Sequence, residues 1–269
     1  MGDHESLVTI GMRGDGDEPM AQDTAIGLLE GIVSDQRDII ADVTGRPAGH
    51  TPQVWALYKE VQEYYEKGMQ VPDDMLLLWC DDNWGNIPRL PTADERKRSG
   101  GAGVYYHFDY VGGPRSYKWL NVTQIAKVWE QMNLANEYGA NRLWIVNVGD
   151  LKPMEVPTEF FLAYAWNPKA WPADKLPEYL QAWAAREFGP QHAGRIASIV
   201  ERYTRYNARR RPEQLEPTTY SLSAYDEAER VVNDYRPLVE EARQVGKALP
   251  KSMQDAYFQL VEYPVRASA

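Results

Sequence analysis

The feature that most constrains the fold is a set of four short apolar runs, each followed by polar residues. These runs occupy 6–12, 75–80, 104–108 and 143–148. Helical periodicity follows three of them, at about 26–43, 122–138 and 158–164. Strands that alternate with helices predict a parallel sheet of four β–α units, because parallel strands need a long crossover connection.

A further helical pattern runs from about 53 to 67, between the first and second apolar runs. Glu60 lies off the apolar stripe of that pattern, which consists of Val54, Leu57, Val61 and Tyr65. The pattern at 26–43 has a stripe made by Ile26, Leu29, Val33, Ile40 and Val43. Both patterns therefore predict amphipathic helices.

Four β–α units amount to half of a (β/α)8 TIM-type barrel, whose complete form takes about 250 residues. The α/β part of this chain covers 1–170. We therefore expect a partial barrel, an incomplete domain whose earlier strands lie upstream of Met1 in a longer sequence. In such barrels the ligand site lies at the carboxyl ends of the strands, so the polar residues after each run are the candidates for chemistry.

Residues 171–269 are expected to form a second, all-α domain, a bundle of about four helices. Asp174 is the expected N-cap of the first helix, which carries Leu176, Tyr179, Leu180 and Trp183. The next two helices are indicated by Ile196, Ile199, Val200 and Tyr203, and by Val231, Tyr235, Leu238, Ala242 and Val245. The last covers about 252–262. The net charge of -10 falls entirely within 1–170, which supports two units.

Composition excludes several classes of protein. Cys80 is the single cysteine, so neither an intramolecular disulfide nor a cysteine-ligated zinc site can form. The acidic balance argues against nucleic-acid binding, which depends on Lys and Arg. No window approaches the ~18 apolar residues of a membrane helix, and the first residues lack the features of a secretory signal. The 9 Trp and 17 Tyr suit both packed cores and stacking on sugar rings.

The acidic loops are the first candidates for chemistry. Asp15 and Asp17 follow the first run, Asp81 and Asp82 follow the second, and Glu60 lies between them. When carboxyl groups lie together in a cleft, their pKa values move apart, so that one can act as a general acid and another as a general base. They can also bind a hard divalent cation, and loops of this composition also occur as solvated turns. The residues alone leave these alternatives open.

Other residues at the ends of the runs suggest contacts with a ligand. Arg13 can bind a carboxylate in bidentate fashion or neutralise a neighbouring Asp. His107 can serve as a ligand, a proton donor or a hydrogen-bonded residue at a strand end. Trp84, Tyr106 and Tyr110 can form an aromatic wall for a sugar, with core packing as the alternative for Tyr106.

Several blocks carry a resemblance to a known family. They are 11–18 (Gly-Met-Arg-Gly-Asp-Gly-Asp-Glu), 79–85 (Trp-Cys-Asp-Asp-Asn-Trp-Gly), 101–117 and 147–153 (Asn-Val-Gly-Asp-Leu-Lys-Pro). In this order they resemble glycoside hydrolase family 115, over nearly the whole chain. The resemblance implies the distal half of a catalytic barrel followed by a helical bundle. It also implies a xylan α-1,2-glucuronidase, which removes glucuronic acid or its 4-O-methyl ether from glucuronoxylan with inversion.

The same resemblance implies roles for individual residues. Inversion needs an acid and a base whose carboxyl groups lie ~6.5–9.5 Å apart. Glu60 is the implied acid, and the base is Asp17 or Asp81. Arg13 would bind the uronate carboxylate, and the further implied substrate contacts are Asp15, Asp82, Trp84, His107 and Tyr110. The chemistry needs no metal and no other cofactor.

Partners and compartment are expectations from this resemblance as well. We expect glucuronoxylan or aldouronic acid oligosaccharides as partners, no nucleic acid and no membrane, and we leave a homodimer open. The full-length parent is expected to be secreted or periplasmic. Because the family's N-terminal domain and first half-barrel are absent, we expect this chain to be a fragment that is inactive alone. Two other classes remain, a non-catalytic carbohydrate-binding protein and a metal-dependent hydrolase that uses the acidic loops.

Overall fold

The computed structural model describes residues 4–21, 25–110 and 120–269. The chain divides into two compact units that are interleaved in sequence. The first comprises Met1–His107 and Gln131–Asn147, and the second comprises Phe108–Glu130 and Val148–Ala269. The boundary expected at residue 170 stays a prediction.

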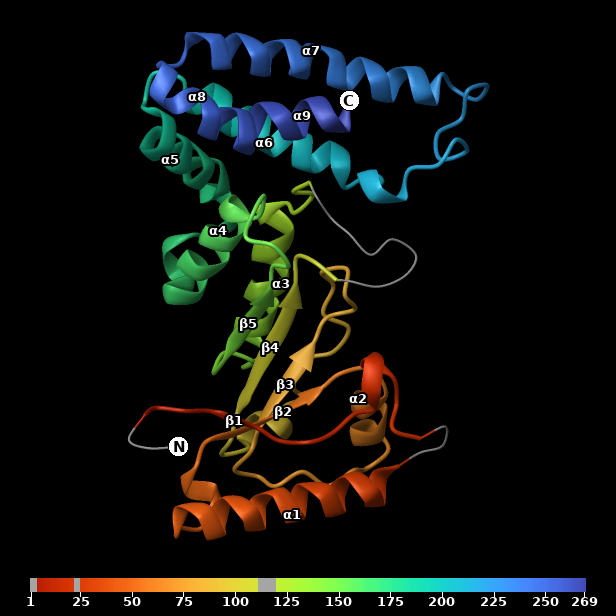
Figure 1. The fold of residues 1–269 in the computed structure, drawn as a ribbon, viewed down its shortest axis with the longest axis vertical. Coiled ribbons are helices and arrows are strands. Elements are labelled where there is room, and N and C mark those ends of the chain that lie inside the picture. Colours follow the sequence, from red (N-terminus) through yellow and green to blue (C-terminus); the bar gives the residue numbers. More distant parts are fainter. Residues whose placement is uncertain (1–3, 22–24, 111–119) are drawn as a thin grey trace. The chain divides into compact units, whose positions relative to one another are not determined.

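The first unit contains a five-stranded parallel sheet, and Figure 1 shows its strands β2 to β5 as arrows coloured from orange to green. Its strands are β1 (Val8–Thr9), β2 (Gln53–Leu57), β3 (Leu76–Cys80), β4 (Ala102–His107) and β5 (Trp144–Asn147). They pair in chain order, and every pair is parallel. This confirms the predicted parallel sheet and a partial barrel.

The helix predicted over 53–67 is wrong in its first part, which forms β2 instead. Val54 and Leu57 have a spacing that fits a helix, but the segment Gln53–Leu57 is buried along nearly its whole length and pairs with strands on both sides. Lys59 then adopts a φ of 49°, which interrupts the chain before α2 (Glu60–Glu66). The sheet therefore has five strands rather than four, and Glu60 lies just after a strand.

The core of this unit lies on both faces of the sheet. Side chains alternate between faces along a strand, and β3 is buried at all five positions. On one face Val54, Leu76 and Leu78 form a cluster with partly buried neighbours. On the other face Trp79 is fully buried and contacts Tyr65 edge to face, at 5.7 Å between ring centroids. A strand buried on both faces matches the uninterrupted apolar run in the sequence.

Helix α1 (Ile26–Thr44) matches its predicted range and turns Leu29, Val33 and Ile40 inward. Val43, which the sequence placed on the same stripe, is 72% exposed. The helix ends at Gly45, which takes a left-handed conformation and donates its N–H to the carbonyl of Ala41. Helix α3 (Ile125–Glu137) contributes residues to both units.

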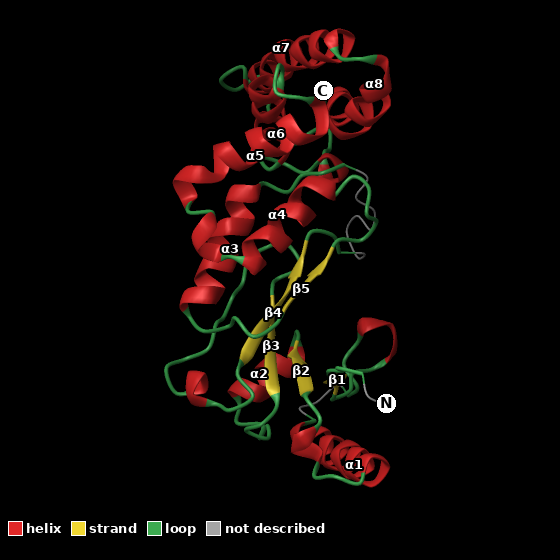
Figure 2. Ribbon diagram, turned by 90° about the vertical axis from the view of Figure 1, so that its left-hand side faces the viewer, coloured by secondary structure: helices red, strands yellow, loops and turns green. Residues whose placement is uncertain are grey.

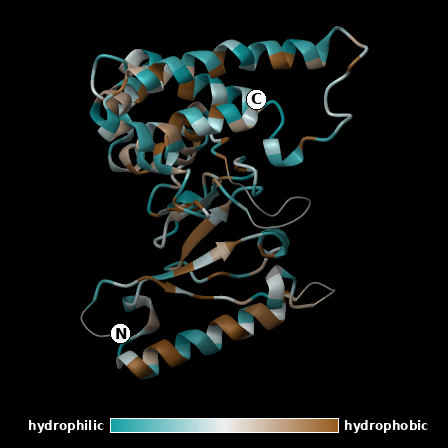
Figure 3. Ribbon diagram, turned by 45° about the horizontal axis from the view of Figure 1, so that its top comes forward, coloured by the Kyte–Doolittle hydropathy of each residue, from teal (hydrophilic) through white to brown (hydrophobic). Residues whose placement is uncertain are grey.

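The second unit contains the expected helical bundle (Figure 2). Its helices are α4 (Glu155–Trp166), α5 (Leu176–Phe188), α6 (Ala193–Asn207), α7 (Glu227–Ala248), α8 (Lys251–Tyr257) and α9 (Tyr263–Ser268). A π-helical turn, Phe258–Glu262, joins α8 to α9, so the last predicted helix runs further than 262. Figure 3 shows α7, at the top, coloured mostly as hydrophilic, which fits a helix with one buried stripe.

The N-cap predicted for α5 is wrong. Asp174 lies inside a 3-10 turn, Ala173–Lys175, and Lys175 takes the cap position without a side-chain hydrogen bond. The apolar residues predicted for α5 and α6 are buried as expected. Over the part of the chain that the structure describes, no helix combines the length and apolar character needed to span a bilayer.

Candidate functional site

The candidate site is assembled at the carboxyl ends of the strands. Parallel pairing in register brings these ends to one edge of the sheet, as the pairs Cys80 with Tyr105 and His107 with Asn147 show. A cavity of about 390 Å³ lies beside the ends of β2 and β3. Its lining includes Tyr58, Glu60, Asp81, Asp82 and Asn83. Residues that follow two neighbouring parallel strands therefore line one cavity at the carboxyl ends, as the parallel topology predicts.

Arg13 and Glu60, 47 residues apart in sequence, form a bidentate ion pair. Nε of Arg13 donates to Oε1 of Glu60 at 2.8 Å, and Nη2 donates to Oε2 at 2.8 Å. The two side chains are 19% and 15% exposed. The guanidinium also lies 4.9 Å from the centre of the Tyr58 ring, within the range of a cation–π contact. One planar cation is thus held by a carboxylate at its edge and an aromatic ring at its face.

The backbone just before Arg13 is held in place by two hydrogen bonds between Gly11 and Gln36. The N–H of Gly11 donates to Oε1 of Gln36 at 2.9 Å, and Nε2 of Gln36 donates back to the Gly11 carbonyl at 3.2 Å. Gly11 has a φ of 110°, and a Cβ there would lie 2.4 Å from Nε1 of Trp55. Only glycine meets both requirements, so this position sets the path of the loop that carries Arg13.

Asp81 is the most tightly held of the predicted site residues. Oδ1 accepts a hydrogen bond from the N–H of Asn83 at 3.1 Å and lies 2.6 Å from Nδ1 of His107. Oδ2 accepts from the N–H of Gly85 at 3.2 Å and from the N–H of His107 at 3.0 Å. The side chain of Asp81 is 0% exposed. Each of its oxygens therefore has two partners, and the carboxylate is shielded from water.

His107 is buried at the end of β4, with its Nδ1 directed at Asp81. An ionised carboxylate only accepts hydrogen bonds, so a hydrogen bond at this contact requires a proton on Nδ1. The ring also packs against Tyr105, with 4.6 Å between centroids. The Tyr105 hydroxyl accepts a hydrogen bond from Nδ2 of Asn147 at 3.2 Å, so β4 and β5 support the imidazole together.

Sequence reasoning missed Tyr58 and Asn83 as members of the site. Nδ2 of Asn83 donates to the Tyr58 hydroxyl at 2.9 Å, which joins the ends of β2 and β3. Both residues follow a strand directly, and that position was the available signal. Tyr58 follows β2 directly, a position that the helix predicted over 53–67 does not reveal.

The remaining predicted site residues are not drawn into this cluster by the contacts described. Asp82 is exposed and shapes its own loop, because Oδ1 accepts from the N–H groups of Trp84 and Asn86 at 2.9 and 3.0 Å. Asp15 is exposed in a 3-10 turn, Asp15–Asp17. The side chain of Asp17 lies outside the described residues. Tyr110 is half-buried and belongs to the second compact unit.

Two further sequence expectations concern Tyr106 and a metal. Tyr106 is buried and donates its hydroxyl to the Gly85 carbonyl at 2.8 Å, so it packs in the core rather than in an aromatic wall. Within the described ranges, no three side chains among His, Cys, Asp and Glu are grouped as a metal ion would need.

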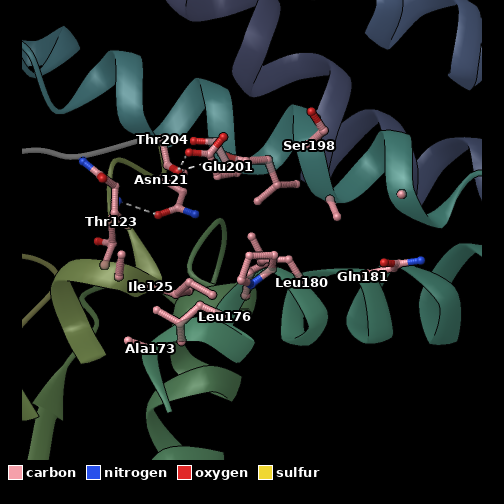
Figure 4. Close-up of a pocket in the computed structure, with 17 residues that line it drawn as sticks. Asn121, Thr123, Ile125, Ala173, Leu176, Leu180, Gln181, Ser198, Glu201 and Thr204 are labelled. Atoms are coloured by element: carbon pink, nitrogen blue, oxygen red, sulfur yellow. Dashed lines mark hydrogen bonds between the residues drawn. The ribbon is translucent and has the colours of Figure 1, made fainter. Parts of the chain in front are cut away.

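A second cavity, of about 500 Å³, lies within the helical unit between the start of α3 and helices α5 and α6 (Figure 4). Its floor is apolar and includes Ile125, Leu176 and Leu180. Asn121 is buried at one end, where its Oδ1 accepts from the N–H of Thr123 at 2.9 Å. Among the described residues, the lining contains no aromatic side chain, so the described part of this cavity lacks the flat faces on which sugars stack.

Comparisons with known proteins agree with the fold. The model of glycosyl hydrolase family 115 matches residues 1–214. A solved structure of a family GH115 4-O-methyl-alpha-glucuronidase, with specificity for decorated arabinogalactans, is 35% identical, with a TM-score of 0.88. The match covers 97% of this chain and 37% of that one, so this chain spans little more than a third of the relative. A search of curated proteins found no match.

Proposed function

Because the chain belongs to glycosyl hydrolase family 115, we propose that it carries the active-site region of an α-glucuronidase. The bond hydrolysed joins glucuronic acid, or its 4-O-methyl ether, to a polysaccharide. We propose α-1,2-linked side chains of glucuronoxylan and its aldouronic acid oligosaccharides as substrates. Decorated arabinogalactans, on which the solved relative acts, are the competing substrate class.

One observation supports this proposal most directly, the position of Arg13 at the carboxyl ends of the strands. A uronic acid differs from a neutral sugar by its carboxylate, and a guanidinium binds a carboxylate through two parallel hydrogen bonds. Arg13 is held over Tyr58 and paired with Glu60, and both of these partners line a cavity of about 390 Å³. These residues can therefore bind an anionic sugar more tightly than a neutral one.

In the proposed reaction Glu60 is the general acid. It gives a proton to the glycosidic oxygen as the bond from that oxygen to the anomeric carbon breaks. A water molecule attacks the anomeric carbon from the opposite face, and a second carboxylate takes a proton from this water. The products are the free uronic acid with inverted configuration and the polysaccharide with a restored hydroxyl group.

We propose Asp17 as the base, because Asp81 is unsuited to that role. Both oxygens of Asp81 already accept two hydrogen bonds and the side chain is 0% exposed, so no position is left for the attacking water. Asp81 instead orients His107, which we propose as a substrate contact together with Asp15, Asp82, Trp84 and Tyr110. We also propose that turnover needs more of the family's polypeptide than this chain.

Calorimetric titration with an aldouronic acid tests the assignment of Arg13. We expect Arg13→Met to weaken binding at least tenfold, because the carboxylate loses its partner. Arg37→Met is the matched control, since Arg37 forms a comparable bidentate pair with Asp74, just before the amino end of β3 rather than at the carboxyl ends. Equal binding by the wild type and Arg13→Met would refute the assignment.

The assignment of Glu60 is tested by measuring the release of uronic acid from glucuronoxylan oligosaccharides. The assay uses the longest protein that contains this chain. We expect Glu60→Gln to bind the substrate and to lose turnover, because an amide has no proton to give. Turnover that survives this substitution would exclude Glu60 as the acid. Binding without turnover in the unsubstituted protein would favour a carbohydrate-binding role.

A further inference from the structure

In the structure Arg13 and Glu60 are bonded to each other, and this pair conflicts with the role that each has in the proposed reaction. Arg13 is to hold the uronate carboxylate, but its Nε and Nη2 already donate to Glu60. Glu60 is to donate a proton, but both of its oxygens accept hydrogen bonds from Arg13. A carboxylate that accepts at both oxygens in this way is a hydrogen-bond acceptor only. The acid is therefore not ready to act while the pair persists.

The conflict is resolved if the substrate takes the place of Glu60. The edge of a guanidinium formed by Nε and one Nη nitrogen fits a single carboxylate in bidentate geometry. The carboxylate of a bound uronic acid and that of Glu60 are the same chemical group, so they compete for this edge. The carboxylate that is displaced loses its ion pair.

We propose that the carboxylate of the substrate displaces Glu60 from Arg13, and that this exchange frees Glu60 to take up a proton and act as the acid. The inference rests on the proposed function. The charge balance at Arg13 is unchanged, because one carboxylate replaces another. The proton comes from solvent and passes to the glycosidic oxygen when the bond breaks.

Other contacts allow Glu60 to leave while Arg13 stays. The guanidinium lies over the Tyr58 ring at 4.9 Å, and Tyr58 is itself anchored by Asn83, so this support does not depend on Glu60. Glu60 is the first residue of α2 and borders the cavity of about 390 Å³, so its side chain has space next to the place it vacates. Arg13 is thus the fixed partner and Glu60 the movable one.

The exchange links recognition to catalysis and determines specificity. A neutral hexose of the same shape can enter the cavity, but it has no carboxylate with which to displace Glu60. The acid then stays paired and the glycosidic bond is not protonated. Selectivity for uronic acids would therefore appear in the rate of the chemical step as well as in binding.

Competition predicts that removing the charge of Glu60 strengthens the binding of a uronate. We would titrate the 269-residue chain with D-glucuronate and, separately, with methyl α-D-glucoside, by calorimetry. Glu60→Gln should bind glucuronate about fivefold more tightly than the wild type, the effect of removing a competing partly exposed ion pair. Glu63→Gln is the matched control, because Glu63 lies on the same helix, borders the same cavity and pairs with Lys67. It should bind as the wild type does.

A second measurement covers the case in which Glu60→Gln does not fold. The side-chain carboxyl carbon of Glu60, labelled with ¹³C, should shift in the NMR spectrum when glucuronate is added to the wild type, and should not shift with methyl α-D-glucoside. If the wild type and Glu60→Gln bound glucuronate equally, or if the carboxyl signal did not change at saturation, the proposed exchange would be refuted. The proposed function would not be affected by that result. Absence of any preference for glucuronate over the glucoside would overturn the proposed function as well.

Discussion

Replacing Asp81 by Asn removes one charge and alters two hydrogen bonds, and we expect it to destabilise the sheet unit strongly. Asp81 accepts from the N–H groups of Asn83, Gly85 and His107, and from Nδ1 of His107, at distances of 2.6–3.2 Å. An Asn side chain keeps one acceptor oxygen and presents an NH₂ group to donors at the other position. Whichever way the amide is placed, two of the four bonds are lost.

The expected loss follows from the size of each bond. Hydrogen bonds to charged groups contribute about 1.5–3 kcal/mol each, so two lost bonds correspond to about 3–6 kcal/mol in the free energy of unfolding. Full burial of the side chain prevents water from replacing the lost partners. Asp82→Asn is the control, because Asp82 makes similar loop bonds on an exposed side chain, and it should lose only about 1 kcal/mol.

Urea denaturation, followed by Trp fluorescence and by the amide NMR signals of β3 and β4, measures both variants. Equal unfolding free energies for Asp81→Asn and Asp82→Asn would refute the reasoning that Asp81 is a buried positioning residue.

Three further outcomes follow from the structure. Gly11→Ala should lower the free energy of unfolding by about 2–5 kcal/mol in urea denaturation, because of its positive φ and the overlap with Trp55; a smaller loss would show that the loop relaxes. Gly31→Ala should raise it by about 0.5–1 kcal/mol, since Gly31 is inside α1 and a Cβ there meets nothing within 4 Å. Burial and the neighbouring charge of Asp81 raise the pKa of the Cys80 thiol to about 12. Because the thiolate is the reactive form and dominates only above that pH, iodoacetamide at pH 8 should label Cys80 in the denatured chain and leave the folded chain unlabelled, as mass spectrometry would show.

The sheet was largely predictable from the sequence, and β2 shows where the prediction ended. A run such as 75–80 is apolar at every position, so burial on both faces can be recognised locally. Val54, Leu57 and Val61 repeat at helical spacing across a strand, a turn and a helix. A short apolar segment does not distinguish the two periods. The helix prediction conceals the fact that Glu60 follows a strand end, so only the family resemblance indicated a role for Glu60.

The helical unit was predictable for a related reason. Residues such as Ile196, Ile199 and Tyr203 repeat at helical spacing over several turns, and all are buried on one face of α6. The cap of α5 was not predictable, because a 3-10 turn at Asp174 precedes the helix and moves the cap by one residue. Helix ends depend on such local hydrogen bonds more than on periodicity.

The sequence is sufficient to predict that buried strands alternate with amphipathic helices, that the strands run parallel and that their polar ends share one edge. These properties depend on local burial patterns and on the length of the connections. The contacts between particular polar residues, in contrast, are visible only in the folded chain. Arg13 contacts Glu60 across 47 positions, and Asp81 contacts His107 across 26. Such contacts depend on the register between strands and on the turn after each one, and no local pattern encodes the distance between two strand ends.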